Sequence, residues 1–260
     1  MGDDVGDATA RFTELMSRSQ ASIPLDEVML AIAAHDHPVD EARALALLDA
    51  LAEDVDGDAD ALAKRLFVTE GFRGNTTDYG DPDNSYLDVA LARRVGIPIT
   101  LSVVMIEVGR RCGVHLTGVG MPGHFLVGAA PGVLYDPFDG GRRLDADGAR
   151  QIFASLRSDV PFRDEYLAPV RARAIAARVL ANLLNAFVDR DPTAAVWAAR
   201  LRLRIPGLAL AERRETAALL GSLGRFEEAA SALDEIAAAL DGDGAERVAR
   251  DAAVLRARAN

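Results

Sequence analysis

Two polar residues in the middle of the chain could form an acid–base pair. His124 lies in a Pro-Gly-His-Phe segment, and Asp136 ends an apolar run twelve positions later. Two antiparallel strands joined by a short turn would bring both side chains to one face of a sheet. A histidine that is held by a carboxylate acts as a general base for a thiol or hydroxyl nucleophile. The pair therefore points to hydrolase or acyl-transferase chemistry, provided that a nucleophile lies beside it.

The candidates for that nucleophile lie in or just after an apolar helix that precedes the pair in the sequence, and they are one thiol and two hydroxyls. Pro98 fits the first position of an apolar helix, where the missing N–H of proline would have no partner in any case. Cys112, the only cysteine, comes fourteen residues later, about 21 Å along the helix and at the end whose dipole disfavours a thiolate. Thr100 and Ser102 lie near the start of the helix, and either hydroxyl could be activated by His124. Ser102 and Thr100 are therefore the alternative nucleophiles.

Less specific roles are also open for the His–Asp pair. His124 could be a core histidine that is hydrogen-bonded to Asp136, or the pair could bind a ligand. We predict no metal site, because His115 is the only other histidine nearby and no zinc-binding spacing is present. The acidic stretch Asp54–Asp60 does not begin a calcium-binding loop, because such a loop would need a glycine at position 59 and a glutamate at position 65, where Ala59 and Arg65 stand. No cofactor is predicted.

The composition limits the classes of partner. The 260 residues include 29 basic and 40 acidic side chains, and the net charge of −11 disfavours binding to nucleic acid. We interpret the basic pairs Arg93–Arg94 and Arg110–Arg111, and the run from Arg171 to Arg178, as solvated helix ends and faces. A single cysteine favours a reducing compartment, and we find neither a signal peptide nor an apolar stretch of about 20 residues. These features predict a soluble, cytoplasmic protein that does not bind membranes.

The first half of the chain is predicted to be an α+β core. Apolar residues recur at helical spacing from Thr13 to about Leu51. A loop rich in turn-forming residues covers 71–86 and leads into a short helix. The buried helix that begins at Pro98 should pack on a small antiparallel sheet. The strands of this sheet are expected at Val114–Val119, His124–Gly128 and Val133–Asp136.

Beyond Asp147 the residues are rich in alanine, leucine and arginine with helical periodicity. Helical hairpins are expected at 173–188 with 192–203 and at 207–222 with 225–240. The second hairpin resembles a tetratricopeptide unit. The predicted domains are a disordered tail at 1–10, N-terminal helices and a core at 11–147, and a helical tail at 148–260.

Several short motifs match one family of proteins. In the core they are Asn84–Leu87, Arg94–Ser102, Pro122–Phe125 and Asp136–Gly141, and in the tail they are Val179–Leu184 and Gly224–Ala229. Through these motifs, residues 71–141 resemble the transglutaminase-like superfamily, whose fold is similar to that of papain. They closely resemble the bacterial Sir B family within it, which joins this core to a tetratricopeptide-like tail. The likeness covers most of residues 20–240.

The resemblance implies a site that lacks its nucleophile. Active members carry glycine, any residue and cysteine at the start of the central helix, about fifteen residues before a glycine that ends it. Counting back from Gly113 places Pro98 at the position of that cysteine. The resemblance also implies that His124 is the base and Asp136 its orienter. The implied binding cleft is lined by Asn84, Ser85, Tyr86, Pro98, Pro122 and Gly123.

The sequence therefore leaves three alternative functions open. The leading one is a non-catalytic transglutaminase-like protein that acts as a protein-interaction or ligand-binding scaffold and binds an unidentified protein partner through its helical tail. The alternative is a hydrolase or amidase that uses Ser102 or Thr100, with His124 as base and Asp136 as orienter. The third is a small-molecule sensor that uses the same cleft.

Overall fold

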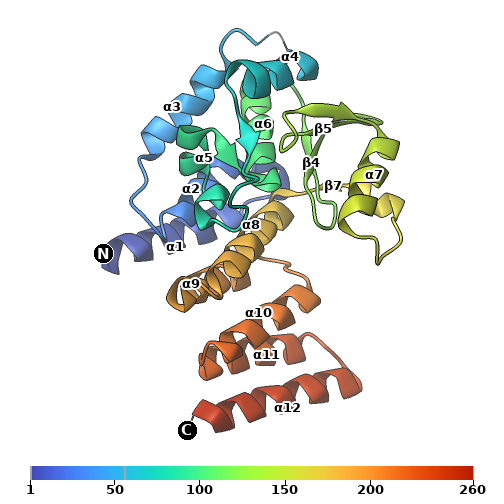
Figure 1. Ribbon diagram of the computed structural model, residues 1–260. Helices are drawn as coiled ribbons and strands as arrows, with labels where there is room; N and C mark the ends of the chain where they lie inside the picture. The colour runs from blue at the N-terminus through green and yellow to red at the C-terminus, as the bar shows by residue number, and fades with distance from the viewer. Residues whose placement is uncertain (1, 56, 260) are drawn as a thin grey trace. The chain divides into compact units, whose positions relative to one another are not determined.

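A computed structural model describes residues 2–55 and 57–259 of the chain, and these form two compact units (Figure 1). The first unit extends to Val179 and the second begins at Leu180. The fold is α+β, as predicted. The change in composition after Asp147 suggested an earlier boundary, and that boundary remains a prediction. Within the described residues, none of the helices combines the length and the apolar character needed to span a bilayer.

The first unit begins with helices that cover one side of its core. They are α1 (Gly2–Ser17), η1 (Gln20–Ser22), α2 (Leu25–Ala33), α3 (Glu41–Ala52), α4 (Ala59–Ala63) and the π-helix η2 (Lys64–Thr69). The composition favoured a disordered tail at 1–10, yet α1 occupies most of that stretch. Ala8, Phe12 and Leu15 are buried and recur at helical spacing, so α1 has an apolar face that packs on α2.

The middle of the first unit is built around one long buried helix. The chain passes through β1 (Arg73–Gly74), η3 (Pro82–Ser85), α5 (Leu87–Arg93) and β2 (Val95–Gly96) before α6 (Pro98–Arg111). The short parallel pair β1–β2 lies within and beyond the stretch predicted to be a loop. Pro98 is the first residue of α6, and nearly every residue of that helix is buried. In Figure 1, α6 lies between α3 and α5 on one side and β4 on the other.

A five-stranded antiparallel sheet completes the first unit. Its strands are β3 (Thr117–Val119), β4 (Leu126–Ala130), β5 (Val133–Asp136), β6 (Arg142–Leu144) and β7 (Pro169–Val170), in the order β6-β5-β4-β3-β7. Between β6 and β7 the chain forms α7 (Ala146–Leu156) and η4 (Asp164–Leu167). Three of these strands correspond to the predicted ones, with ends shifted by up to three residues. The two edge strands were missed, because two or three residues are too few to show an alternating pattern.

A charge network closes the C-terminal end of α6. Asp26 and Glu107 are each only 2% exposed. Arg111 donates to both carboxylates and also to Asp49, and Arg110 donates to both as well. Burial and the charge of Asp26 raise the pKa of Glu107. The interpretation of Arg110–Arg111 as a solvated helix end is therefore wrong for Arg111, whose side chain is 12% exposed.

The second unit is all helical. It contains the end of α8 (Ala172–Phe187), then α9 (Pro192–Leu203), α10 (Leu210–Ser222), α11 (Phe226–Ala238) and α12 (Gly242–Ala259). Asp191 caps α9 by accepting from the N–H groups of Thr193 and Ala194. The predicted helical hairpins are present, and α12 adds a helix that packs on α11. Their likeness to tetratricopeptide repeats remains a prediction.

Candidate functional site

His124 and Asp136 form a direct hydrogen bond in the first unit. His124 Nε2 and Asp136 Oδ2 are 2.8 Å apart, and the two residues are 8% and 2% exposed. Strands β4 and β5 pair with Val127 opposite Tyr135, so the start of β4 and the end of β5 lie at the same end of the pair. His124 precedes β4 by two residues and Asp136 ends β5. The spacing of twelve positions therefore brings the two side chains together, as the sequence predicted.

The carboxylate of Asp136 uses both oxygens. Oδ1 accepts from the backbone N–H groups of Phe138, at 3.1 Å, and Asp139, at 3.3 Å. Oδ2 accepts from His124 Nε2, which assigns the proton of a neutral imidazole to Nε2 and leaves Nδ1 as an acceptor. No hydrogen bond joins Nδ1 to any part of the chain that the structure describes. The pair is thus arranged as an oriented base, with its accepting nitrogen available.

Arg178 fixes the turn that carries His124. Its Nη2 donates to the carbonyl oxygens of Met121 and His124, each at 2.8 Å, and its guanidinium carbon lies 5.5 Å from the centroid of the Phe125 ring. Burial lowers the pKa of Arg178. The interpretation of this arginine as part of a solvated face is therefore wrong. The one available signal was its position between two apolar stretches, Ile175–Ala177 and Val179–Leu180.

The start of α6 holds Pro98, Thr100 and Ser102, all of them buried. The hydroxyls of Thr100 and Ser102 have no hydrogen-bond partner among the described residues. Neither is bonded to His124, so the contact required by a serine or threonine nucleophile is not formed. Cys112 follows the last residue of α6, and its thiol contacts the carbonyl oxygen of Gly109 at 3.5 Å. The only thiol therefore lies at the opposite end of the helix from Pro98.

The predicted cleft residues 84–86 differ from one another in the groups that they contact. Asn84 is buried, and its amide accepts from Asn75 Nδ2 and donates to the carbonyl oxygens of Asp78 and Tyr79. It therefore holds the loop that follows β1, and its own carbonyl accepts from the N–H of Ile97, just before α6. Ser85 is buried beside it.

Tyr86 faces the N-terminal helices. Its ring makes an edge contact with His37, with 5.0 Å between the centroids. Burial and the nearby carboxylate of Asp36 raise its pKa. None of these contacts involves His124 or Asp136, so the place of Tyr86 in the cleft remains a prediction.

Pro122 and Gly123 form the turn that precedes His124. Pro122 is half-buried and Gly123 is exposed. Gly123 has φ +82°, a left-handed conformation that favours glycine. The turn closes through the N–H of His124, which donates to the carbonyl oxygen of Met121 at 3.0 Å. Both residues therefore position His124.

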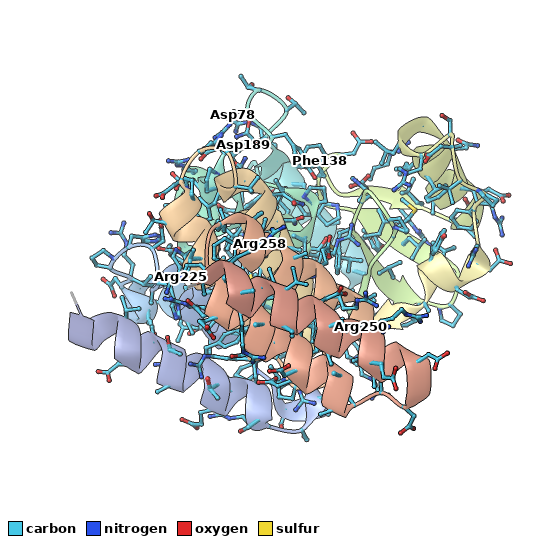
Figure 2. The ribbon with its side chains drawn as sticks, turned by 90° about the horizontal axis from the view of Figure 1, so that it is seen from below. Asp78, Phe138, Asp189, Arg225, Arg250 and Arg258 are labelled. Carbon is cyan, nitrogen blue, oxygen red and sulfur yellow. The ribbon has the colours of Figure 1, made fainter. Side chains whose placement is uncertain are left out.

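Two aromatic residues that the sequence did not single out lie next to His124. The ring of Phe138 makes edge contacts with His124, at 6.1 Å between centroids, and with Tyr79, at 5.9 Å. Gly74 makes room for this ring, because a Cβ there would lie 2.5 Å from it. Figure 2 labels Phe138 in the β5–β6 turn and Asp78 in the loop before Tyr79. Tyr79 is 54% exposed, so this row of rings leads from the histidine to solvent.

The described residues contain no group of three or more His, Cys, Asp and Glu side chains that could hold a metal ion. His115 is exposed and is not part of the contacts around His124. The chemistry that the arrangement itself offers is therefore that of an oriented imidazole, a buried carboxylate and a nearby guanidinium.

Comparisons with known proteins match the same part of the chain. A family model described as the transglutaminase-like superfamily matches residues 20–181. A UPF0162 protein of Xylella fastidiosa is 43% identical over 139 residues, which are 50% of this chain and 49% of that protein. A UPF0162 protein of Vibrio cholerae is 37% identical over 82 residues, 29% of this chain and 30% of the relative.

A shorter match joins the chain to a eukaryotic protein. F-box only protein 21 of Mus musculus is 40% identical over 83 residues, which are 31% of this chain and 13% of that protein. The chain spans about half the length of the UPF0162 proteins of Xylella fastidiosa that it matches. No solved structure matches the chain significantly.

Proposed function

Since this chain belongs to the transglutaminase-like superfamily, we propose that it is a non-catalytic member, which binds a ligand at the His124 site and a protein partner through its helical tail. This role is the one that the sequence resemblance to the Sir B family leads us to expect. The observation that carries the proposal is the proline at the first position of α6, two residues after Gly96. That is the position from which active relatives are expected to attack.

A proline at this position removes two groups that acyl transfer needs. It has no thiol, so a thioester cannot form. It also has no backbone N–H, and backbone N–H groups beside a nucleophile commonly stabilise the oxyanion of the intermediate. Cys112 cannot replace the thiol, because it lies past the far end of α6. The His124–Asp136 pair thus has no acyl acceptor to activate.

The hydroxyl alternative has little support from the geometry. Thr100 and Ser102 are 0% exposed and make no hydrogen bond with His124. A general base must lie within hydrogen-bond reach of the proton that it removes, directly or through one water. We therefore favour the ligand-binding role over a serine or threonine hydrolase.

Replacing Pro98 with cysteine tests the assignment directly. The new thiol would lie at the N-terminus of α6, where the helix dipole favours a thiolate. If Pro98 occupies the nucleophile position, the thiol also lies beside His124, which favours the thiolate further. We expect Pro98→Cys to be alkylated by iodoacetamide at pH 6 about tenfold or more faster than Cys112, which serves as the internal reference. Adding His124→Phe should remove most of the difference. Pro98→Ala is the matched variant without a thiol and should show labelling at Cys112 alone.

Two results would count against the non-catalytic proposal. Equal rates at positions 98 and 112 would mean that Pro98 does not occupy a nucleophile position. Labelling of the wild-type protein by a fluorophosphonate probe, lost in His124→Ala, would instead establish the hydrolase.

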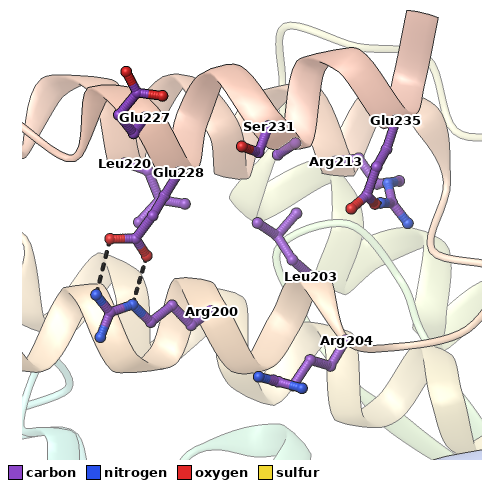
Figure 3. A pocket seen from close by; sticks show the side chains of 10 residues that line it. Arg200, Leu203, Arg204, Arg213, Leu220, Glu227, Glu228, Ser231 and Glu235 are labelled. Atoms are coloured by element: carbon purple, nitrogen blue, oxygen red, sulfur yellow. Dashed lines mark hydrogen bonds and ion pairs between the residues drawn. The ribbon is translucent and has the colours of Figure 1, made fainter. Parts of the chain in front are cut away.

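The proposed partner site is a groove of about 700 Å³ in the second unit, lined by α9, α10 and α11 (Figure 3). Leu203 and Ser231 point toward its interior from facing helices. Arg200 donates two hydrogen bonds to Glu228, and Arg213 is paired with Glu235, so these charges are neutralised within the groove.

Arg204 gives the groove a positive charge. It lines the same groove and forms no ion pair with any residue that the structure describes. An unpaired cation beside Leu203 and Leu220 supports a partner segment with an acidic side chain next to an apolar one.

A photo-crosslinking residue at Ser231 tests this site in cells. Ser231 is exposed in the groove, and Arg250 on α12 is an exposed position outside it. We expect one protein to be crosslinked at 231 and not at 250, and to be lost when Leu203→Glu places a charge in the groove. The same products at both positions would contradict the proposal.

A further inference from the structure

The turn that carries His124 is held by a helix from outside its own sheet. Val119 pairs with Leu126 at the end of the β3–β4 ladder, so residues 120–125 extend beyond the paired strands. Arg178 of α8 donates to the carbonyl oxygens of two residues in this turn, one of them His124, each at 2.8 Å. Because the donor is charged, these bonds are stronger than hydrogen bonds between neutral groups. The position of His124 therefore depends on α8 as well as on the sheet.

A second arginine of α8 makes contacts of the same kind with another segment. Arg173 donates from Nε and Nη2 to the carbonyl oxygens of Met16 and Arg18, each at 2.9 Å. Like Arg178, it is half-buried and donates to two backbone oxygens. These bonds hold the end of α1 rather than the turn of His124. The two arginines therefore attach the first turns of α8 to two separate parts of the first unit.

Helix α8 is continuous across the boundary between the two units. The first unit extends to Val179 and the second begins at Leu180, whereas the helix ends at Phe187. Arg178 thus lies less than one helical turn before the tail. The second half of α8 lines a second groove, of about 320 Å³, together with α9 and α10, so this half is packed within the tail. Fraying or displacement of that half is expected to reach Arg178, because backbone hydrogen bonds link residues four positions apart in an α-helix.

We propose that Arg178 is a positioning residue of the His124 site, and that through it the position of His124 depends on the state of the helical tail. While Arg178 holds the turn, His124 keeps Nε2 on Asp136 and can accept from a ligand through Nδ1. When the second half of α8 frays or shifts, the two bonds to the turn are lost and the imidazole is no longer held in that orientation. The inference rests on the ligand-binding part of the proposed function and gives that site a form of regulation.

Two methionine variants of the full chain separate positioning from a general stabilisation of α8. Arg178→Met and Arg173→Met each keep the aliphatic part of the side chain and remove two hydrogen bonds to backbone oxygens. The readouts are the hydrogen-exchange rate of the His124 backbone N–H, which donates to Met121, and the His124 ring signals in nitrogen-15 NMR spectra. We expect Arg178→Met to raise that rate by about tenfold or more and to shift the ring signals, since loss of a charged hydrogen bond has about that effect. Arg173→Met should leave the ring signals in place and the rate within about twofold of the wild type.

Two glycine variants test the dependence on the tail. Ala181 and Ala218 line the second groove, from α8 and α10 respectively. Replacing an alanine within a helix by glycine weakens that helix without introducing a new side chain. We expect Ala181→Gly to raise the exchange rate of the His124 N–H by about threefold or more, because α8 is the helix that carries Arg178. Ala218→Gly weakens α10 to a similar extent and should leave that rate unchanged.

The inference is overturned if the His124 N–H exchanges at the same rate in the two methionine variants, or if their ring signals coincide. It is also overturned if the two glycine variants have the same effect, since the tail would then not act through α8. Should Arg178→Met fail to fold, the glycine variants decide alone. None of these measurements uses Pro98→Cys or a ligand, so failure here is distinguishable from failure of the proposed function.

Discussion

Asp136 is the residue whose replacement tests the geometry of the site most directly. Asp136→Asn keeps one oxygen that can accept from the N–H groups of Phe138 and Asp139. Its amide nitrogen must then donate to His124 Nε2, which is possible only if the imidazole proton moves to Nδ1. The variant should therefore fold, with the other tautomer of His124 and with a neutral hydrogen bond in place of a charge-assisted one.

The cost of each substitution follows from the groups left without partners. Exchanging a charged for a neutral acceptor costs about 1 kcal/mol. Asp136→Ala removes the acceptor for His124 Nε2 and for the N–H groups of Phe138 and Asp139, in a site where Asp136 is 2% exposed. Asp139 is at an exposed position, so water can replace the acceptor of its N–H and two donors remain to be counted. Two unsatisfied buried donors at about 1–3 kcal/mol each predict a loss of about 3–4 kcal/mol. For a unit of this size, the melting temperature should fall by about 2–4 °C for Asn and by about 6–16 °C for Ala.

The assay needs a probe in the first unit. Trp197, the only tryptophan, lies on α9 in the second unit, so its fluorescence does not report on this site. Far-UV circular dichroism gives the melting temperature, and long-range nitrogen-15 NMR spectra of the imidazole give the tautomer. The expected result is an Nε2–H tautomer in the wild type and an Nδ1–H tautomer in Asp136→Asn.

Two results would refute this reasoning. An unchanged tautomer in Asp136→Asn would mean that the carboxylate does not orient the ring. A loss below about 0.5 kcal/mol in Asp136→Ala would mean that the buried hydrogen bonds are not formed, since surface substitutions have effects of that size.

Two further predictions concern charge pairs away from the site. The Arg200 guanidinium holds the pKa of Glu228 at about 2, below its usual value of 4.5, so ionised Glu228 stabilises the fold above pH 4.5 and loses this effect as the pH falls toward 2. Because both side chains are partly exposed, Glu228→Gln should lower the free energy of unfolding by about 1 kcal/mol or less at pH 7. Urea titrations should show this loss becoming smaller below pH 4.5. A loss that does not depend on pH would contradict the pairing. Arg111→Met leaves two buried carboxylates undercompensated and should cost about 3 kcal/mol or more in thermal unfolding. The exposed pair of Arg142 with Asp139 is the control, and Arg142→Met should lower the free energy of unfolding by less than about 1 kcal/mol. Equal losses in Arg111→Met and Arg142→Met would exclude the network around Arg111 as a stabilising element.

The His–Asp pair could be predicted because its geometry depends on local features. Alternating apolar residues and the Pro131–Gly132 turn define two paired strands, and the pairing determines which residues meet at their ends. The buried helix that begins at Pro98 could also be predicted from the sequence, because an apolar stretch of that length is compatible with few other structures. The fold class and most helices follow from the same two periodicities.

The contacts that complete the site depend on segments that are distant in sequence, and local patterns carry little information about them. Arg178 meets the carbonyl oxygen of His124 across 54 positions of sequence. Phe138 meets the position of Gly74 only because the β5–β6 turn comes close to β1. The small, acidic composition of the first ten residues predicts a disordered tail, whereas the burial of Phe12 and Leu15 against α2 stabilises a helix there. Such tertiary contacts override local composition.

Under the proposed function, the position of Pro98 explains how a nucleophile could be lost without loss of the fold. The first residue of a helix is the one place in it where proline causes no disruption, so α6 and the sheet beside it are unaffected. The His124–Asp136 bond therefore persists in a site where it has no thiol to activate, and packing alone is a weak reason for it. Buried ionic groups are often less stabilising than apolar side chains of the same volume. A ligand that contacts the accepting Nδ1 of His124 would give the buried pair a role that packing does not, which agrees with the ligand-binding part of the proposed function.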